Sequence, residues 1–128
     1  MITAKILVVD DIFSNQLLLK SVIENAGIDC KVTSNGKLAI EALEKEHFDL
    51  IFMDIEMPVM NGIEATKFIR NQMSDDKKNT PIVALTAHNH YEFSQTTANV
   101  GFNEIVSKPY SPDKFKELFK KYIPEKIK

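Results

Sequence analysis

The stretch LIFMDIEMPVMNG, residues 50–62, decides the fold class. Its first four residues form a continuous apolar run, which is typical of a parallel strand that is covered on both faces of a sheet. The run ends on a carboxylate, Asp54, and the chain then leaves through Pro58, which restricts the backbone, and Gly62, which lets it turn. An ionisable group at the end of so apolar a strand is the first candidate for chemistry in this chain.

Four other short runs have the length and composition of strands, and they alternate with helical patterns. The strands are expected at residues 6–9, 30–33, 82–85 and 105–107, and the helices at about 14–26, 38–46, 63–73, 91–100 and 113–122. Ser14 is expected to cap the first helix and Gly27 to end it. The pattern at 91–100 is weak because it is rich in Ser and Thr, so a short, loosely packed helix is expected there. The polar segment 71–81 is expected to be an exposed loop.

Five strands alternating with helices predict an α/β fold with a doubly wound, five-stranded parallel sheet. A chain of 128 residues suits one such domain with a sizeable core. In open parallel sheets, ligands bind outside the carboxyl ends of the strands. The residues at those ends are therefore the candidates for function.

The overall composition is that of an ordinary globular protein, and the net charge of −2 gives no reason to expect direct binding to nucleic acid or to a membrane. Cys30 is the only cysteine, so an intrachain disulfide is excluded and a reducing compartment fits. No apolar run approaches the roughly 18 residues of a membrane span, and the N-terminus lacks the apolar segment of a signal peptide. We expect a cytoplasmic protein or a cytoplasmic fragment.

Four of the five expected strands bring a polar or charged group to the same edge of the sheet. The groups are Asp10 and Asp11 after the first strand, Asp54 at the third, Thr86 at the fourth and Lys108 after the fifth. Each of them alone is compatible with an ordinary turn or cap residue. The complete set at one edge is much harder to explain by chance and indicates a functional site.

Three carboxylates at one edge repel one another, and a hard divalent cation relieves that repulsion. Mg²⁺ suits a few carboxylates with several waters, and Mn²⁺ could substitute. His88 and His90 are interpreted as exposed loop residues rather than zinc ligands. A carboxylate beside a metal and a lysine suits phosphoryl transfer, because it can attack phosphorus and form an acyl phosphate. Thr86 would donate to a phosphoryl oxygen, and the small Ala87 would leave room for the donor.

Four blocks of the sequence resemble the CheY-like receiver domain of two-component response regulators. The blocks are ILVVDD, LIFMDIEMPVMNGIEA, IVALTA and SKP, and the resemblance, in order and spacing, extends over essentially the whole chain. It implies a (βα)5 flavodoxin-like fold with strand order 2-1-3-4-5. We expect the receiver domain to span residues 1–124, followed by a C-terminal tail at 125–128.

The resemblance implies that Asp54 is the phosphoacceptor. The phosphodonor would be a phosphohistidine on a histidine kinase or on a histidine phosphotransfer domain. Mg²⁺ would be held by the side chains of Asp10, Asp11 and Asp54 together with the backbone carbonyl of Glu56. The chain would then be a signalling switch that promotes its own phosphorylation and dephosphorylation, rather than an enzyme acting on other substrates.

The resemblance also assigns the residues that read the phosphoryl group. Lys108, in a cis peptide bond to Pro109, would bind it, and Thr86 would be the switch hydroxyl. The family often has an aromatic switch residue three positions before the lysine, where this chain has Ile105. A rotating ring therefore cannot be carried over, and a β-branched side chain has stiff rotamers. We expect phosphorylation to change the protein-interaction face formed by residues 91–100, strand 105–107 and the last helix.

Three positions are candidates for tuning the lifetime of the phosphoryl group: Glu56, Ala87 and His88. We expect the side chains of Glu56 and His88 to flank the path of the hydrolytic water. The stretch VDDIFSNQLLLKSVIENAG is similar to the receiver parts of hybrid histidine kinases, in which an Asn at the position of Asn15 is frequent. Such kinases often carry Asn where this chain has Ile12. A hybrid-kinase or phosphorelay receiver, monomeric or weakly dimeric, is favoured over a transcription factor.

Three alternatives fit less well. A phosphatase with an Asp nucleophile would resemble DxDGT, whereas Asp54 is followed by IEMP, and the chain has no room for a cap domain. A degenerate receiver that is never phosphorylated would lack Asp11, Asp54 or Lys108, and all three are present. A nucleotide-binding flavodoxin-like domain would need a Gly-rich or Ser/Thr-rich loop after the first strand, and DDIFSNQ is not one.

Overall fold

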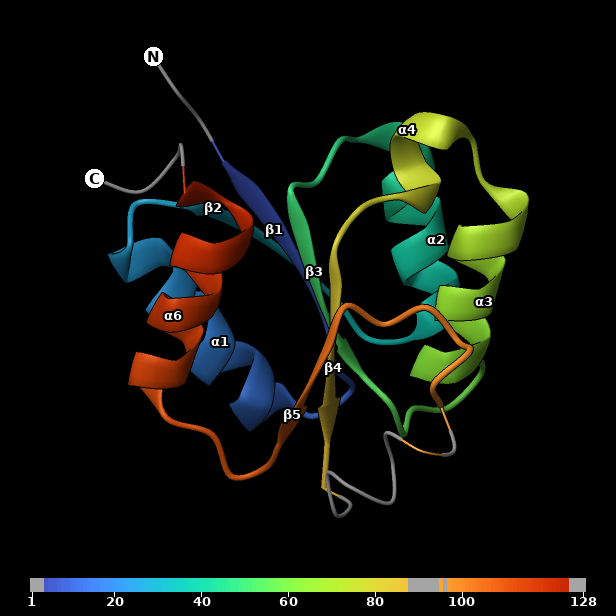
Figure 1. Ribbon diagram of the computed structural model, residues 1–128. Coiled ribbons are helices and arrows are strands. Elements are labelled where there is room, and N and C mark those ends of the chain that lie inside the picture. Colours follow the sequence, from blue (N-terminus) through green and yellow to red (C-terminus); the bar gives the residue numbers. More distant parts are fainter. Residues whose placement is uncertain (1–3, 88–94, 96, 125–128) are drawn as a thin grey trace.

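The computed structural model describes residues 4–87, 95 and 97–124 and has the predicted architecture. Five parallel strands form one sheet in the order β2-β1-β3-β4-β5 (Figure 1). They are β1 (Lys5–Val9), β2 (Asp29–Thr33), β3 (Leu50–Asp54), β4 (Ile82–Thr86) and β5 (Glu104–Ser107). The predictions of an α/β class, a parallel sheet and strand order 2-1-3-4-5 are confirmed.

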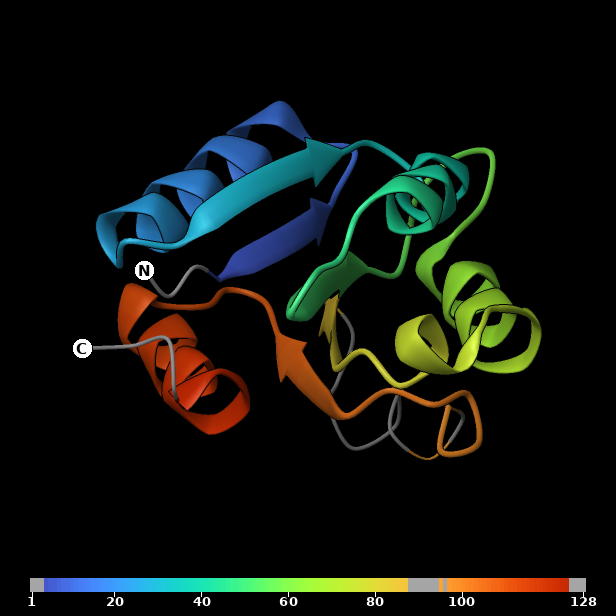
Figure 2. The same cartoon turned by 90° about the horizontal axis from the view of Figure 1, so that it is seen from above.

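Helices cover both faces of the sheet (Figures 1 and 2). One face carries α1 (Phe13–Asn25) and α6 (Pro112–Tyr122), and the other carries α2 (Gly36–Lys45), α3 (Gly62–Gln72) and the short α4 (Asp75–Lys78). This is the doubly wound arrangement. In the part of the chain that the structure describes, no helix has both the length and the apolar character needed to cross a bilayer.

Alternate residues of the central strands face two separate cores. Val8 and Phe52 belong to the core under α1 and α6, while Val9 and Met53 belong to the core under α2 and α3. All four side chains are fully buried, which explains why these strands are apolar without interruption. Phe52 also packs edge-to-face on Phe115 of α6, with ring centroids 5.1 Å apart.

The strand register aligns the carboxyl ends at one edge of the sheet. Asp54, the last residue of β3, lies beside Leu85 of β4. Thr86, the last residue of β4, lies beside Ser107 of β5. The functional candidates of three neighbouring strands therefore meet at the same edge, as parallel pairing requires.

The beginning of β1 and the end of α6 lie at the opposite end of the sheet, where the strands start (Figure 1). α6 runs back along the sheet from the carboxyl ends of the strands. Near its last turn, the Tyr122 hydroxyl donates a hydrogen bond of 2.8 Å to Glu104 Oε1 at the start of β5. The beginning of the first strand and the end of the last helix thus lie away from the candidate site.

The start of α1 differs from the prediction. Its N-cap is Ile12, not Ser14, and no side chain caps the helix. Asp10 Oδ1 instead accepts a hydrogen bond of 2.9 Å from the Ile12 N–H, so the helix begins directly after the acidic pair. The predicted helix end is confirmed, because Gly27 follows α1 with a φ of 79°, a conformation that favours glycine.

Residues 71–81 are more ordered than the predicted loop, because α4 forms within them. Arg70, the only arginine in the sequence, lies at the end of α3 and holds this region. Its guanidinium donates hydrogen bonds to the carbonyl oxygens of Lys78, Thr80 and Gly101 and to Asn103 Oδ1. These bonds join α3 to the segment that precedes β4 and to the segment that follows it.

Most of the helix predicted at 91–100 lies outside the described residues, as does the tail at 125–128. Residues 97–100 form a turn, in which the Val100 N–H donates to the Thr97 carbonyl at 3.0 Å. The other predicted helices and all five strands are confirmed, with bounds shifted by at most two residues.

Candidate functional site

The structure brings the three predicted acidic residues together. Asp10 follows β1 and is fully buried, Asp54 ends β3 and is 4% exposed, and Asp11 is exposed. One carboxylate oxygen from each lies within 4.8 Å of the others. The site is therefore an acidic cluster that opens at one side to solvent.

Hydrogen bonds to its backbone and to its side chain hold Asp10 in place. Its N–H donates a hydrogen bond of 3.0 Å to the Thr33 carbonyl of β2. Its carbonyl accepts a hydrogen bond of 2.6 Å from Gln16 Nε2 of α1, and its Oδ1 accepts from the Ile12 N–H. The carboxylate is thus fixed between the sheet and the first helix, with Oδ2 left to face the cluster.

Lys108 completes the arrangement from the loop after β5. Its Nζ lies 3.2 Å from Asp54 Oδ1 and forms an ion pair with it. Its backbone N–H donates a hydrogen bond of 2.6 Å to the Thr86 carbonyl. The Lys108–Pro109 peptide bond is cis, as the family resemblance implies. Lys108, which follows β5, therefore connects to the end of β3 through its ammonium group and to the end of β4 through its backbone N–H.

The electrostatic balance at the cluster disfavours two bare carboxylates. Burial raises the pKa of Asp54, the charge of Asp10 raises it further, and Lys108 opposes both effects. Burial likewise raises the pKa of Asp10, against the hydrogen bond from Ile12 and the charge of Lys108. One lysine does not fully compensate the desolvated acids, so added positive charge would stabilise their ionised forms.

The donor set fits a hard cation. Asp10 Oδ2 is buried and, among the residues that the structure describes, has no hydrogen-bond partner. A buried carboxylate oxygen without a partner is costly. An ion bound by Asp10, Asp11 and Asp54 would satisfy it with the oxygen ligands that such cations prefer.

A pocket of about 160 Å³ opens beside Asp54. It is lined by Ile12, Ile55, Glu56, Thr86, Ala87 and Lys108 as well as Asp54. Thr86 is buried, whereas Ala87 and Glu56 are exposed at the pocket's rim. Five of the predicted site residues thus surround one space, which is a suitable size for a small anionic group such as a phosphoryl.

Two predicted residues stand apart from this pocket. Ile105 of β5 is half-buried and packs against a small cluster formed by Ile55 and Ala84. Ile55 follows Asp54 directly, so this cluster lies between Ile105 and the site. His88, one of the predicted tuning residues, lies outside the described residues.

The loop that leaves Asp54 is tightly constrained. The Gly62 N–H donates a hydrogen bond of 3.0 Å to the Ile55 carbonyl, and a Cβ at Gly62 would lie 2.3 Å from the Asp54 carbonyl oxygen. The φ of Gly62 is not in the left-handed region. Glycine is therefore needed here for the close approach of the Asp54 carbonyl and not for an unusual backbone conformation. Asn61 and Glu64 then form a capping box that starts α3.

Sequence reasoning missed two residues of the site. Gln16 holds the Asp10 backbone, and Tyr110, two residues after Lys108, has a buried hydroxyl whose pKa is raised by burial and by the charges of Asp10 and Asp54. The contact of Gln16 is with a main-chain carbonyl, which no side-chain pattern reveals. No sequence pattern marks Tyr110, because the cis bond between Lys108 and Pro109 lies in the segment that leads to it and breaks the alternation of an extended strand.

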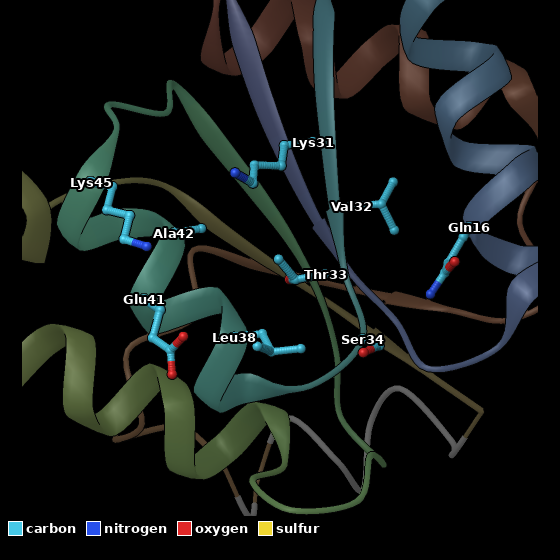
Figure 3. Close-up of a pocket in the computed structure, with 9 residues that line it drawn as sticks. All are labelled: Gln16, Lys31, Val32, Thr33, Ser34, Leu38, Glu41, Ala42 and Lys45. Carbon is cyan, nitrogen blue, oxygen red and sulfur yellow. The ribbon is translucent and has the colours of Figure 1, made fainter.

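A larger pocket, of about 480 Å³, lies beside the edge strand β2 and α2 (Figure 3). Lys31 and Lys45 bring positive charge to it and Glu41 negative charge. Lys31 Nζ is already paired with Glu46 Oε2 at 2.8 Å. The pocket shares none of the acidic cluster, so its size does not make it the functional centre.

Comparisons with known proteins identify a family for this chain. Residues 6–120 match the model of the response regulator receiver domain. The probable histidine kinase 1 of Oryza sativa subsp. indica is 31% identical over 94% of this chain and 16% of its own length. The sensor protein GacS of Pseudomonas syringae pv. syringae is 33% identical over 92% of this chain and 13% of its own. The chain thus spans less than a fifth of the length of these curated relatives.

Solved structures show the same fold. The receiver domain of the sensor histidine kinase PA1611 from Pseudomonas aeruginosa PAO1 has a TM-score of 0.86 and 27% identity, covering 96% of this chain and 99% of that one. That structure holds a magnesium ion in its active-site cleft. The chemotaxis response regulator CheY4 of Vibrio cholerae has a TM-score of 0.86 and 31% identity, covering 95% and 100%. The chain therefore belongs to the family of response regulator receiver domains of two-component signalling.

Proposed function

We propose that Asp54 accepts a phosphoryl group from a phosphohistidine on a histidine kinase or a histidine phosphotransfer domain. The observation that carries this proposal is the position of the Asp54 carboxylate. It lies within a cluster of acids, 3.2 Å from the Lys108 ammonium, on a pocket of about 160 Å³. An ion pair that opens onto such a pocket suits the transfer of a phosphoryl group better than it suits structural stabilisation.

In the proposed reaction, an Asp54 carboxylate oxygen attacks phosphorus. The new oxygen–phosphorus bond forms as the bond between phosphorus and the donor imidazole breaks, and the imidazole nitrogen keeps the bonding electron pair. Lys108 and the Thr86 hydroxyl stabilise the negative charge on the transferred group. Ala87 leaves the approach to Asp54 open, in keeping with its small exposed side chain at the pocket.

We propose Mg²⁺ as the cation of the acidic cluster, with Mn²⁺ as a substitute. Asp10, Asp11, Asp54 and the Glu56 backbone carbonyl would hold it. When bound, it neutralises the carboxylates and the charge of the phosphoryl oxygens. The orphan oxygen Asp10 Oδ2 and the raised pKa values of Asp10 and Asp54, both caused first by burial, support a cation here.

The output of phosphorylation is proposed to be a changed protein-interaction surface. The phosphoryl group adds close to two negative charges, and Thr86 is the residue that reports them to the chain beyond β4. Ile105, packed against the cluster of Ile55 and Ala84, is the proposed second switch residue. Glu56, Ala87 and His88 are proposed to tune the rate at which the acyl phosphate hydrolyses.

The biological setting is proposed from the sequence and the relatives. We propose that residues 1–124 form the receiver domain of a hybrid histidine kinase or phosphorelay protein, with a tail at 125–128. The domain would act in the cytoplasm, as a monomer or weak dimer, without direct contact with nucleic acid or membrane. The net charge of −2 supports the last point.

The test is phosphorylation by a small phosphodonor. The protein is incubated with acetyl phosphate and Mg²⁺, and its intact mass is measured. The wild type should gain the mass of one phosphoryl group, and Asp54→Asn should gain none. Asp75→Asn, at an exposed carboxylate of α4, is the matched control and should behave as the wild type. A wild type that gains no mass, or an Asp54→Asn variant that does, would refute the proposal.

A further inference from the structure

A column of aromatic rings leads to the acidic cluster from the α6 side. Asp10 and Asp54 follow Val8 and Phe52 by two residues in extended chain, so they continue the face of the sheet that α1 and α6 cover. Phe52 packs on Phe115, and Phe115 packs edge-to-face on Tyr110, with ring centroids 4.9 Å apart. Tyr110 is therefore the last ring of the column, two residues after the lysine that pairs with Asp54.

Two polar atoms at this place lack hydrogen-bond partners. The Tyr110 hydroxyl and Asp10 Oδ2 are both buried, and within the described part of the chain neither makes a hydrogen bond. Buried polar atoms are almost always paired, with protein groups or with ordered water. Two such atoms at one site suggest that something other than the chain itself normally connects them.

Burial and the neighbouring acids keep the Tyr110 hydroxyl protonated. Burial raises the pKa of the phenol, and the charges of Asp10 and Asp54 raise it further. A neutral phenol can both donate and accept a hydrogen bond. An open pocket of about 350 Å³ adjoins the ring of Tyr110, and one of its other lining residues is Lys108, which pairs with Asp54.

We propose that Tyr110 is a positioning residue of the cation site: its hydroxyl forms a hydrogen bond with a water molecule that the bound cation holds, next to Asp10. This inference rests on the proposed cation site. Mg²⁺ keeps several of its waters when bound to proteins. Partners that lie beyond the direct ligands orient those ligands and strengthen binding.

The oxygen of Tyr110 has no evident structural purpose. The ring packs on Phe115 and on the core around it, and a phenylalanine would fill the same space. Tyr122 offers the opposite case, because its hydroxyl donates to Glu104 Oε1 at the far edge of the sheet. The two tyrosines therefore allow one hydroxyl with a partner in the chain to be compared with one that has none among the residues described by the structure.

The test measures Mg²⁺ affinity by calorimetric titration of the full chain. Tyr110→Phe should raise the dissociation constant for Mg²⁺ about tenfold, without lowering the melting temperature of the metal-free protein. Tyr122→Phe should leave Mg²⁺ affinity unchanged and lower that melting temperature. Mg²⁺ should also alter the near-ultraviolet tyrosine circular dichroism of the wild type, and this change should be lost in Tyr110→Phe.

The possible failures are distinguishable. If Tyr110→Phe binds Mg²⁺ as tightly as the wild type, the inference is wrong, whether or not the metal-free variant is destabilised. If the wild type becomes phosphorylated and binds Mg²⁺, but Tyr110→Phe binds Mg²⁺ equally tightly, the proposed function stands and only the inference about Tyr110 fails. If the wild type neither binds Mg²⁺ nor gains a phosphoryl group, the inference and the proposed function fail together.

Discussion

Gly62 approaches Asp54 so closely that the first turn of α3 rests on the phosphoacceptor candidate: a Cβ at Gly62 would lie 2.3 Å from the Asp54 carbonyl oxygen. The same Cβ would lie 2.9 Å from the Met53 side chain. Any side chain at this position must therefore push α3 or the end of β3 away. The placement of α3 and the geometry of the site therefore both depend on the absence of a side chain at Gly62.

Gly62→Ala should consequently destabilise the protein by about 2 kcal/mol, because overpacking forces the backbone to shift. It should also slow phosphorylation by acetyl phosphate, since Asp54 moves with the strand end. Urea unfolding and intact-mass time courses measure the two effects. The control is Gly27→Ala, where φ is 79° but nothing lies within 4 Å. It should lower stability and leave the phosphorylation rate alone. Equal rates in both variants would contradict this account.

Asp54→Asn and Asp10→Asn should each stabilise the metal-free protein at neutral pH by about 1 kcal/mol, as is common when a charge is removed from a strained site. Burial raises the folded-state pKa of both carboxyls. The wild type therefore loses stability as pH rises from the ordinary carboxyl range through the raised pKa values. The advantage of the variants should shrink as pH falls towards that range. Chemical unfolding in a chelator at several pH values checks it, and an advantage that grows at low pH would refute it.

Mg²⁺ should raise the melting temperature of the wild type, because an ion that binds only the folded state stabilises it. At a concentration one hundred times the dissociation constant, the gain is about 2.7 kcal/mol. Asp10→Asn should lose most of this gain, and added chelator should reverse it. An equal shift in the wild type and in Asp10→Asn would place the ion somewhere other than the acidic cluster.

Arg70→Lys should destabilise the protein by about 2–3 kcal/mol, since lysine cannot reproduce four hydrogen bonds in a planar fork. The carbonyl oxygens of Lys78, Thr80 and Gly101 would lose their shared donor. Thermal unfolding measures the loss, and Lys67→Ala on the exposed side of the same helix is the control. Because Arg70 does not touch the acidic cluster, Arg70→Lys should still be phosphorylated below its melting temperature. A stable Arg70→Lys variant would show that these bonds add little.

The fold and most of the site could be predicted because they follow from local patterns. Continuous apolar runs marked the buried strands, and parallel pairing then required Asp10, Asp54, Thr86 and Lys108 to meet at one edge. Each of these side chains either ends its strand or follows it immediately in the sequence. Their convergence needed no knowledge of distant packing.

The features that could not be predicted depend on contacts between main chain and distant side chains. Arg70 recognises carbonyl oxygens that lie 8 to 31 residues away, and any residue type supplies a carbonyl. Ser14 has the residue type of an N-cap, but the helix starts earlier, with Ile12 as its N-cap, and the Ile12 N–H donates to Asp10 Oδ1. The role of the Tyr110 hydroxyl depends on the aromatic column beneath it, which forms only when α6 packs on the sheet.

The beginning of β1 and the end of α6 share the edge of the sheet that faces away from the acidic cluster (Figure 1). A tether at Lys5 or Tyr122 would therefore leave the acidic cluster uncovered. Such a domain can be spliced into a longer polypeptide, or moved between polypeptides, without steric cost to its reaction. The long relatives, in which the matching part is less than a fifth of the chain, are assemblies that this geometry permits.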